Sequence, residues 1–402
     1  MSNEISIIGA GIAGLTLAIS LHTQGIPCAI YETRPEPQNI GGAVMLSPNS
    51  LRLFDNMGIY ESLRRLGYSF DDLYLRDLAS SLKETYPFGS VEKYGYSGVR
   101  VYRFELIDLL LDKVNTSNIP IYFNRKFSHV VSETEDTVTW QLIDGTTKTS
   151  SLLVGADGIH SRVRKYMYPE LAPKFTGIAG ITAAVPTANL KLPSPDYKMP
   201  VTIVSPSHGA FVIAPQKADG SEVLIGKQKR MTGLSREGWE KFYADKDAAA
   251  AFLRQDAEVF GDIAVTATSK IPHENINIWP FYVIPKLDSW SSDHRRVLLV
   301  GDSAHAVPPS SGQGINQAVE DVVMLAILLG KGRSGKKDLG WWQGFRQDRI
   351  EQILLLNARV DRRRLPKIMG SEEQADDEQG FDLDWLYDID AVAEVEKYVG
   401  GL

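Results

Sequence analysis

The sequence predicts an α/β fold built from a mainly parallel sheet, a mixed sheet that interrupts it along the chain, and C-terminal helices. Three observations support this prediction. A strand, a glycine turn, a helix and a second strand open the chain, short strands broken by Pro and Gly occupy residues 175–290, and a buried strand near residue 300 leads into two long helices. A chain of 402 residues has room for two or three such units.

Hydrophobic spacing defines the first unit. Residues 5–8 form a short β-branched run, residues 12–21 have helical spacing that Gly25 ends, and residues 27–31 form a second apolar run. This order predicts a βαβ unit.

The elements that follow carry their own start and stop signals. A helix is expected to begin at Pro48-Asn49 and to end at Gly58, and another includes residues 106–110. Residues 130–153 alternate between apolar and polar side chains, with Asp144-Gly145 as a hairpin turn. Within the mixed-sheet region we expect one helical insert near residues 239–260.

The last third of the chain is predicted to return to the first sheet. Residues 297–300 read as a buried strand, residues 315–329 as a helix, and residues 341–365 as a long helix that Pro366 stops. From residue 371 onward there are eleven acidic residues and one basic residue. The apolar group Trp385, Leu386 and Tyr387 in this acidic tail predicts that it docks on the protein.

Composition excludes several classes of protein. With 43 basic and 50 acidic residues the net charge is −7, which disfavours nucleic acid as a partner. A single cysteine, Cys28, cannot form an internal disulfide, and seven scattered histidines leave no cluster at metal-ligand spacing. No segment is long and apolar enough to span a membrane. We expect a reduced, metal-free, cytoplasmic protein.

The glycines of the first unit indicate a bound dinucleotide. Gly9, Gly11 and Gly14 lie between a strand and a helix, where glycine lets the backbone approach a pyrophosphate at the helix N-terminus. Glu32 ends the second strand and can accept hydrogen bonds from ribose hydroxyls, so the nucleotide should lack a 2′-phosphate. The same spacing at residues 330–335 follows no strand, and we interpret it as a loop.

A second loop, which begins at Gly301, also faces the predicted nucleotide. Asp302 can hold a chain of hydroxyl groups, while Gly312 and Gly314 expose amides suited to a flavin carbonyl. The alternative is a hydrolase, because residues 301–305 nearly match a nucleophile elbow. The fifth residue is His, however, and no helix is expected to start directly after the serine, so we reject this alternative.

Three motifs give the chain a family resemblance from residue 5 to about residue 365. They are the N-terminal glycine motif with Glu32, the Asp-Gly motif at residues 155–164 and the Gly-Asp motif that begins at Gly301. Gly42-Ala43 and Arg103 support the match. With these motifs the chain resembles the class A flavoprotein monooxygenases, the family of para-hydroxybenzoate hydroxylase and salicylate hydroxylase.

The resemblance implies a Rossmann-like FAD-binding domain, with NAD(P)H as a transient reductant that has no domain of its own. It implies that Arg103 contacts FAD, Asp302 binds its ribityl chain, and Asp157 couples the FAD and NAD(P)H regions. The full expected cofactor site is Gly9, Gly11, Gly14, Glu32, Arg34, Gly42, Ala43, Arg103, Asp157, Asp302, Gly312, Gly314, Ile315 and Asn316. The expected regions are the first part of the FAD-binding domain (1–174), a mixed-sheet substrate domain (175–290), the returning part of the FAD-binding domain (291–366) and an acidic tail (367–402).

The implied reaction transfers one oxygen atom of O2, through a flavin C4a-hydroperoxide, to an electron-rich aromatic, indole or alkene. We expect residues 201–215 and 307–311 to line the pocket, with His208, Phe211 and Pro309 as candidates. Residues 201–215 contain no charged side chain, which favours an apolar substrate. Ala214 stands where phenol hydroxylases of the family often have Tyr, so epoxidation stays open alongside hydroxylation.

Other functions for the same fold are a flavin-dependent halogenase, an oxidase or a non-catalytic flavoprotein. The halogenase pattern requires a second tryptophan that the segment from Trp279 to Pro285 lacks. Consumption of NAD(P)H with and without substrate discriminates among them.

Overall fold

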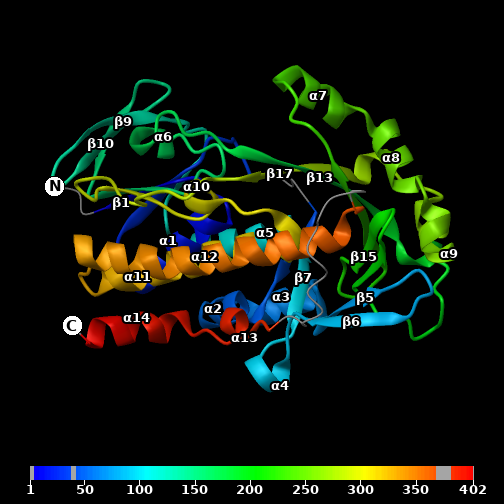
Figure 1. The fold of residues 1–402 in the computed structure, drawn as a ribbon. Helices are drawn as coiled ribbons and strands as arrows, with labels where there is room; N and C mark the ends of the chain where they lie inside the picture. Colours follow the sequence, from blue (N-terminus) through cyan, green and yellow to red (C-terminus); the bar gives the residue numbers. More distant parts are fainter. Residues whose placement is uncertain (1–3, 38–41, 368–381, 402) are drawn as a thin grey trace.

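The computed structural model describes residues 4–37, 42–367 and 382–401. Its first sheet has five parallel strands in the order β18-β12-β1-β2-β8 (Figure 1). The strands are β1 (Ile5–Ile8), β2 (Cys28–Tyr31), β8 (Ile121–Tyr122), β12 (Leu152–Gly155) and β18 (Val297–Leu299). The predicted βαβ unit and the returning strand are therefore confirmed.

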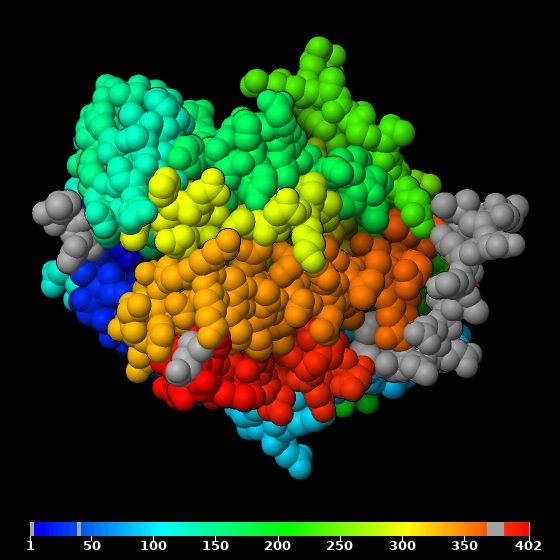
Figure 2. All heavy atoms as spheres, turned by 60° about the vertical axis from the view of Figure 1, so that its left-hand side comes forward, coloured from blue at the N-terminus to red at the C-terminus, as the bar shows by residue number. Residues whose placement is uncertain are grey.

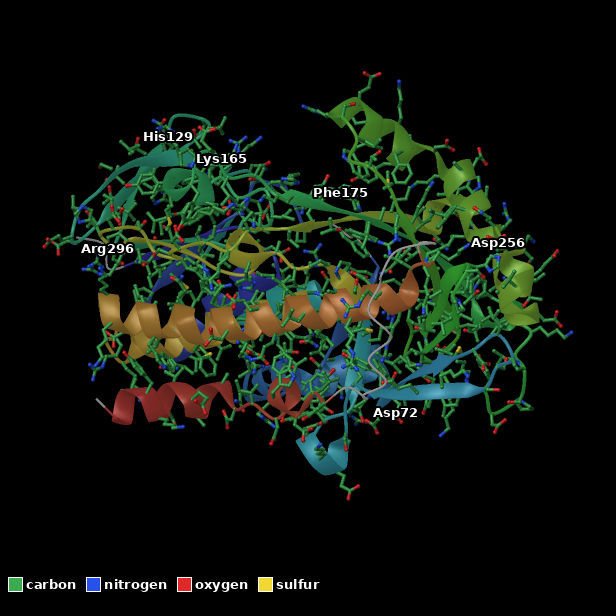
Figure 3. All side chains as sticks on the ribbon, viewed as in Figure 1. Asp72, His129, Lys165, Phe175, Asp256 and Arg296 are labelled. Atoms are coloured by element: carbon green, nitrogen blue, oxygen red, sulfur yellow. The ribbon has the colours of Figure 1, made fainter. Side chains whose placement is uncertain are left out.

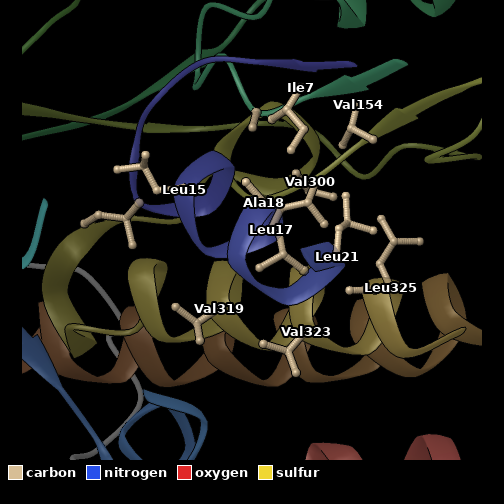
Figure 4. Close-up of a cluster of buried hydrophobic side chains, with 14 of the residues drawn as sticks. Ile7, Leu15, Leu17, Ala18, Leu21, Val154, Val300, Val319, Val323 and Leu325 are labelled. Atoms are coloured by element: carbon tan, nitrogen blue, oxygen red, sulfur yellow. The ribbon is translucent and has the colours of Figure 1, made fainter. Parts of the chain in front are cut away.

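Helix α1 (Ile12–Thr23) connects β1 to β2 and is packed between the sheet and α11 (Gly314–Gly330). Figure 4 shows Leu17 and Leu21 of α1 between strand residues such as Val154 and the α11 residues Val323 and Leu325. Complete burial of one leucine or valine side chain stabilises the folded state by about 1.5–3 kcal/mol. Helix α5 (Arg103–Thr116) also packs against α1.

The second large sheet is mixed and has seven strands, in the order β17-β13-β16-β15-β14-β5-β6. Helices cover one of its faces. Phe175, labelled in Figure 3, lies on β13, and its ring packs edge-on against that of Trp239 with centroids 5.2 Å apart. The strands are β5 (Asp72–Arg76), β6 (Leu82–Pro87), β13 (Lys174–Pro186), β14 (Val201–Ser205), β15 (Gly209–Pro215), β16 (Glu222–Arg230) and β17 (Ile276–Val283). Three helices, α7 (Arg236–Ala244), α8 (Lys246–Arg254) and α9 (Asp262–Thr268), occupy the region where one insert was expected. Helices α8 and α9 contribute buried residues to the covered face, whereas α7 has none.

Strands β5 and β6 join this sheet from a distant part of the sequence. They lie within residues 1–174, which we expected to belong wholly to the FAD-binding domain. Strand β5 pairs in parallel with β14, and β6 forms the sheet edge. Local patterning shows that a segment is a strand, but it does not show which sheet the strand joins.

Two three-stranded sheets complete the β-structure. One consists of β3 (Ala43–Leu46), β7 (Gly98–Tyr102) and β4 (Tyr68–Phe70), and it lies between the two large sheets. The other consists of β9 (Phe127–Glu133), β10 (Val138–Leu142) and β11 (Thr147–Ser150), and its β10–β11 hairpin turns at Asp144-Gly145 as predicted. Helices α2 (Pro48–Asn56), α3 (Tyr60–Leu66), α4 (Val91–Tyr94), α6 (Arg164–Met167) and α10 (Asp302–His305) fill the connections.

Helix α12 (Lys336–Arg364) begins five residues before the predicted start and crosses the whole molecule (Figure 1). The loop at residues 330–335 connects α11 to α12, as interpreted from the sequence. Two C-terminal helices, α13 (Asp384–Tyr387) and α14 (Ala391–Gly400), lie along the side of this layer (Figure 2). Leu386 and Tyr387 are fully buried, which confirms docking for residues 382–401. In the described part of the chain no helix is long and apolar enough to cross a membrane.

Candidate functional site

A cavity of about 510 Å³ lies between the carboxyl end of the parallel sheet, the β3-β7-β4 sheet and the open face of the seven-stranded sheet. One end, which we call the nucleotide end, is formed by the glycine turn, β3 and the loop that follows β18. The other, which we call the sheet end, is formed by the mixed sheet, the C-terminus of α12, and the parts of β3, β7 and the loop after β18 that carry Met45, Arg100 and residues 307–310. The nucleotide end is lined by Gly11, Ile12, Ala13, Gly42, Ala43, Val44, Arg103, Ala156, Gly158, Val300, Asp302, Gly312, Gly314, Ile315 and Ala318.

The glycine turn has the close backbone contacts that its spacing predicts. Gly9 has φ +110°, and a Cβ atom there would lie 2.5 Å from the Ala156 carbonyl oxygen. A Cβ atom on Gly14 would lie 2.0 Å from the Gly9 carbonyl oxygen, so only glycine fits this crossing. Gly11 instead faces open space and lines the cavity. The first turn of α1 is thus open to a ligand on the cavity side.

Glu32 holds the turn in place from the end of β2. Its carboxylate accepts a 2.8 Å hydrogen bond from the Ala10 amide and a 2.9 Å hydrogen bond from the Arg34 amide. Each carboxylate oxygen can accept more than one hydrogen bond, so these contacts leave capacity for ribose hydroxyls. Arg34 is exposed at the mouth of this turn, and neither residue belongs to the cavity wall.

Asp302 and Arg103 line the nucleotide end and interact electrostatically. Burial raises the pKa of Asp302 above its usual value, and His305 and Arg103 partly offset this effect. Burial also lowers the pKa of Arg103, while Asp302 raises it. The carboxylate faces the open cavity although protein surrounds it, which suits hydrogen bonding to a polyol.

The start of α11 provides a second edge of the nucleotide end. Gly312, Gly314 and Ile315 line the cavity. Asn316, expected to contact the cofactor, is instead fully buried. Its side chain donates to the carbonyls of Met45 and Gly312 and accepts from the Ser47 amide at 3.1 Å. Asn316 therefore positions β3 against the α11 loop and does not line the cavity.

Asp157, like Asn316, joins two neighbouring segments of the chain through hydrogen bonds. Its carboxylate accepts hydrogen bonds from the Arg162 and Val163 amides, at 2.7 and 3.2 Å, and from the Ser303 hydroxyl at 3.1 Å. The bond from Ser303 ties the Asp-Gly motif to the Gly-Asp motif. Arg164 strengthens the link, because its buried guanidinium donates to the Ser303 carbonyl at 2.9 Å.

One of the two reasons for rejecting a hydrolase, that no helix starts next to the serine, is wrong. A short helix, α10, does include Ser303, contrary to expectation. Ser303 is nevertheless fully buried and donates to Asp157, while His305 is paired with Asp321 through Nε2 at 2.5 Å. Serine and histidine thus have separate partners, and the arrangement lacks the serine–histidine bond of a catalytic triad.

Strand alternation determines which side chains of the mixed sheet face the cavity at the sheet end. Thr202, Val212, Gly226 and Thr182 are aligned across β14, β15, β16 and β13, and all four line the cavity. The remaining wall at this end is Met45, Leu73, Arg100, Gly180, Pro200, Val201, Ala214, Leu224, Lys227, Gln228, Trp279, Phe281, Val307, Pro309, Ser310 and Arg364. Gly180 and Gly226 let Phe281 and Thr182 lie close to the strands, because an added Cβ atom would come within 3.2 and 2.9 Å of these side chains.

Of the three pocket candidates, only Pro309 belongs to this wall. Phe211 is fully buried on the opposite, helix-covered face of the sheet, with its ring centroid 5.8 Å from that of Phe260. His208 lies in the β14–β15 turn, where Nδ1 is bonded to Ser205 and Ser207. Alternation places Val212 in the cavity and turns its neighbour Phe211 away from it.

Charged residues at the sheet end were missed by the sequence analysis. Arg100, Lys227 and Arg364 border the cavity, although residues 201–215 themselves add no charge to its wall. The Lys227 ammonium group donates to the Phe252 and Gln255 carbonyls on the helix-covered side, at 3.2 and 2.7 Å. The sequence does contain one indication of a charged residue on this wall: Arg100 and Tyr102 alternate with apolar residues along β7, so they share one face of that strand.

The nucleotide end fits FAD on its own geometry. Gly11 leaves room above a helix N-terminus, the carboxylate of Asp302 faces the cavity, and Arg103 adds a cation beside it. These donor and acceptor groups match a pyrophosphate joined to a polyol chain.

Comparison with known proteins gives consistent findings. The family described as "FAD binding domain" matches residues 2–351. The 3-amino-4-hydroxybenzoate 2-monooxygenase PtmB3 of Streptomyces platensis is 30% identical over 81% of this chain and 79% of its own length. Hispidin-3-hydroxylase of Neonothopanus nambi is 28% identical over 95% of this chain and 94% of its own length.

Solved structures share the fold at lower identity. CtdE in complex with FAD and a substrate superimposes with a TM-score of 0.77 at 21% identity, covering 100% of this chain and 98% of that one. HpxO of Klebsiella pneumoniae, complexed with FAD and uric acid, has a TM-score of 0.74 at 23% identity, covering 89% and 88%.

Proposed function

The chain belongs to the FAD-binding family of these flavin-dependent monooxygenases, and from that premise we propose that it couples oxidation of NAD(P)H to insertion of one atom of O2 into an electron-rich aromatic compound. The main support is the single cavity. It runs without interruption from Gly11 and Asp302 to a sheet wall that carries Trp279 and Phe281. Cofactor and aromatic substrate can thus occupy one continuous cavity.

The residues at the nucleotide end would hold the cofactor. The α1 N-terminus would bind the pyrophosphate, Asp302 would accept hydrogen bonds from the ribityl hydroxyls, and Arg103 would lie beside it. Bound FAD would supply the chemistry, accepting a hydride from NAD(P)H and activating O2. Amides at the start of α11, next to Gly312 and Gly314, would stabilise negative charge on the reduced ring.

The sheet end would orient the substrate and exclude water. Trp279 and Phe281 offer aromatic surfaces, and Thr202 and Thr182 offer hydroxyl groups for orientation. Ala214 lines the cavity and has no side-chain group that could deprotonate a phenol, so the substrate ring would have to be electron-rich without help from that residue. Hydroxylation of an activated ring is therefore the first reaction to test, and epoxidation of an indole or alkene the second.

NAD(P)H is proposed to bind transiently near the junction of the Asp-Gly and Gly-Asp motifs, with Asp157 holding that junction together. The four regions expected from the sequence, including a substrate domain at residues 175–290, are kept as the proposed domain division, with β5 and β6 added to the substrate side. A cytoplasmic location is part of the proposal, because the reaction consumes NAD(P)H.

The test is NAD(P)H oxidation by purified enzyme loaded with FAD, with a panel of hydroxylated benzoates, pyrones, indoles and alkenes. We expect one class to accelerate oxidation and to yield a product heavier by one oxygen atom. Oxidation that yields only hydrogen peroxide with every compound would instead indicate an oxidase. Turnover that requires chloride or bromide would indicate a halogenase, and a bound flavin that NAD(P)H never reduces would indicate a non-catalytic flavoprotein.

A further inference from the structure

Arg100 occupies a distinctive place in the cavity wall. It lies on β7 directly opposite Met45 of β3, so the two side chains share one face of their sheet. Met45 also borders a side cleft lined by Leu73, Thr202 and Arg364, which belong to the sheet end of the cavity. Arg100 is 6% exposed and borders the cavity at that level.

The guanidinium of Arg100 has no protein partner within residues 4–37, 42–367 and 382–401. Its Nε atom is buried without a hydrogen bond, and no carboxylate forms an ion pair with it. The other cations of the wall are different. Arg364 donates to the Ser310 carbonyl at 3.1 Å, Lys227 donates to two carbonyls, and Arg103 interacts with Asp302.

Arg100 still carries a charge under working conditions. Burial lowers its pKa to about 10, which leaves the guanidinium protonated at pH 7 to 8. A buried cation without a counterion is costly, and the cost falls when an anion reaches it. A planar guanidinium fork is well matched to two oxygens of one planar anion.

We infer that Arg100 is a specificity-determining residue that binds a planar oxyanion of the substrate, either a carboxylate or the enolate of an acidic hydroxypyrone. The inference rests on the proposed function, because it assigns the sheet end of the cavity to the substrate. It replaces the expectation of an apolar substrate with an aromatic or heteroaromatic acid. The oxyanion would fix which edge of the ring faces the cofactor.

The substrate is a better partner for Arg100 than the cofactor is. Arg103, three residues further along the chain, already lines the nucleotide end together with Asp302 and Gly11. Arg100 lies opposite Met45, whose side chain packs beside Gly312 and also lines the side cleft with Leu73 and Thr202. That cleft gives a substrate room next to Arg100.

The test measures ligand binding to the FAD-loaded enzyme through the change in flavin absorbance, without turnover. The probes are three pairs: a hydroxybenzoate and its methyl ester, a hydroxynicotinate and its methyl ester, and a 4-hydroxy-2-pyrone and its 4-methyl ether. The proteins are wild type, Arg100→Met, Arg100→Lys and, as a matched control, Arg362→Met on the exposed side of α12.

Wild type is expected to prefer at least one anion over its neutral partner by about 10- to 100-fold, the size of a charge-assisted hydrogen bond. Arg100→Met should abolish that preference without weakening the neutral ligand, Arg100→Lys should keep part of it, and Arg362→Met should keep all of it. The preferred pair distinguishes a carboxylate from an enolate.

Two results would overturn the inference. One is wild-type enzyme that binds each anion no better than its neutral partner, a measurement that needs no variant to fold. The other is Arg100→Met that loses affinity for FAD in titrations of the apoprotein while its preference for the anion is unchanged, since the cofactor would then be the partner. Anion binding that depends on Arg100 without any stimulation of NAD(P)H oxidation would uphold the subsite and contradict the proposed function.

Discussion

Replacing Arg349 with methionine should release the C-terminal helices from the rest of the protein. The buried guanidinium of Arg349 donates to both carboxylate oxygens of Glu320, at 2.9 and 3.1 Å. It also donates to the backbone carbonyls of Trp385 and Leu386, at 2.7 and 3.0 Å. One side chain therefore joins α11, α12 and α13.

The expected loss in the free energy of unfolding is at the lower end of the range measured when one partner of a buried ion pair is removed. Removing one partner of such a pair costs about 3–5 kcal/mol. Glu320 would keep Arg346 and a 2.5 Å hydrogen bond from Asn49, so its charge would not be left alone. A loss of about 3 kcal/mol corresponds to a fall in melting temperature of about 4 °C for a chain of this length.

The assay is a thermal melt of the FAD-loaded enzyme together with limited proteolysis of the folded state. Arg349→Met should melt about 4 °C lower and be cleaved faster between residues 382 and 401 than the control Arg362→Met. Equal melting temperatures and equal cleavage in the two variants would show that the Arg349 contacts do not anchor the C-terminal helices.

Three further predictions follow from the same structure. Asp302→Asn should weaken FAD binding by about tenfold or more, measured by titration of the apoprotein, while Asp348→Asn on the exposed side of α12 should leave it unchanged; equal affinities would remove Asp302 from the site. Burial raises the pKa of the Cys28 thiol to about 12, so the folded protein should not react with Ellman's reagent at pH 8 and should yield one thiol after denaturation; fast labelling of the native state would contradict this burial. Burial opposes ionisation of Glu320, but Arg346 and Arg349 outweigh it and hold the pKa of Glu320 below its ordinary value. The stabilisation from ionised Glu320 is therefore present above the unfolded-state pKa of about 4.3 and is lost as the pH falls through the folded-state pKa. Glu320→Gln should have a lower free energy of unfolding than wild type at pH 7, and that free energy should fall less steeply in acid. Parallel curves of unfolding free energy against pH for variant and wild type would refute this linkage.

The nucleotide end could be predicted from the sequence because its determinants are local. Gly9 and Gly14 are required by one turn, and their contacts involve the strand and helix on either side of it. Asp302 lies three residues after the last residue of the returning strand, so its place near the end of the sheet follows from the order of elements. Asn316 and Asp157 are near the predicted site, yet their hydrogen bonds go to neighbouring loops.

The sheet end could not be predicted in the same way, because it depends on which face of each strand is covered. Phe211 was predicted to line the pocket, but α8 and α9 pack on its face of the sheet, so it belongs to the core. Arg100 and Leu73 reach the cavity only because β7 and β5 pair with strands that are remote in sequence. No local pattern contains that pairing.

The burial of Glu320 illustrates the same limit. Its position within α11 would suggest an ordinary helix residue, suitable as a control for Asp302. The structure shows it fully buried and paired with arginines 26 and 29 positions away. Only the packing of α12 against α11 reveals this network, and a variant of Glu320 would report on stability instead of cofactor binding.

The most direct test of the central claim is the origin of the oxygen atom in the product. The FAD-loaded enzyme is supplied with NAD(P)H, an aromatic acid that stimulates oxidation, and 18O2 in unlabelled water, and the product is analysed by mass spectrometry. We expect one 18O atom per product molecule. A product that takes its new oxygen from water, or NAD(P)H oxidation that ends only in labelled hydrogen peroxide with every aromatic acid tested, would contradict it.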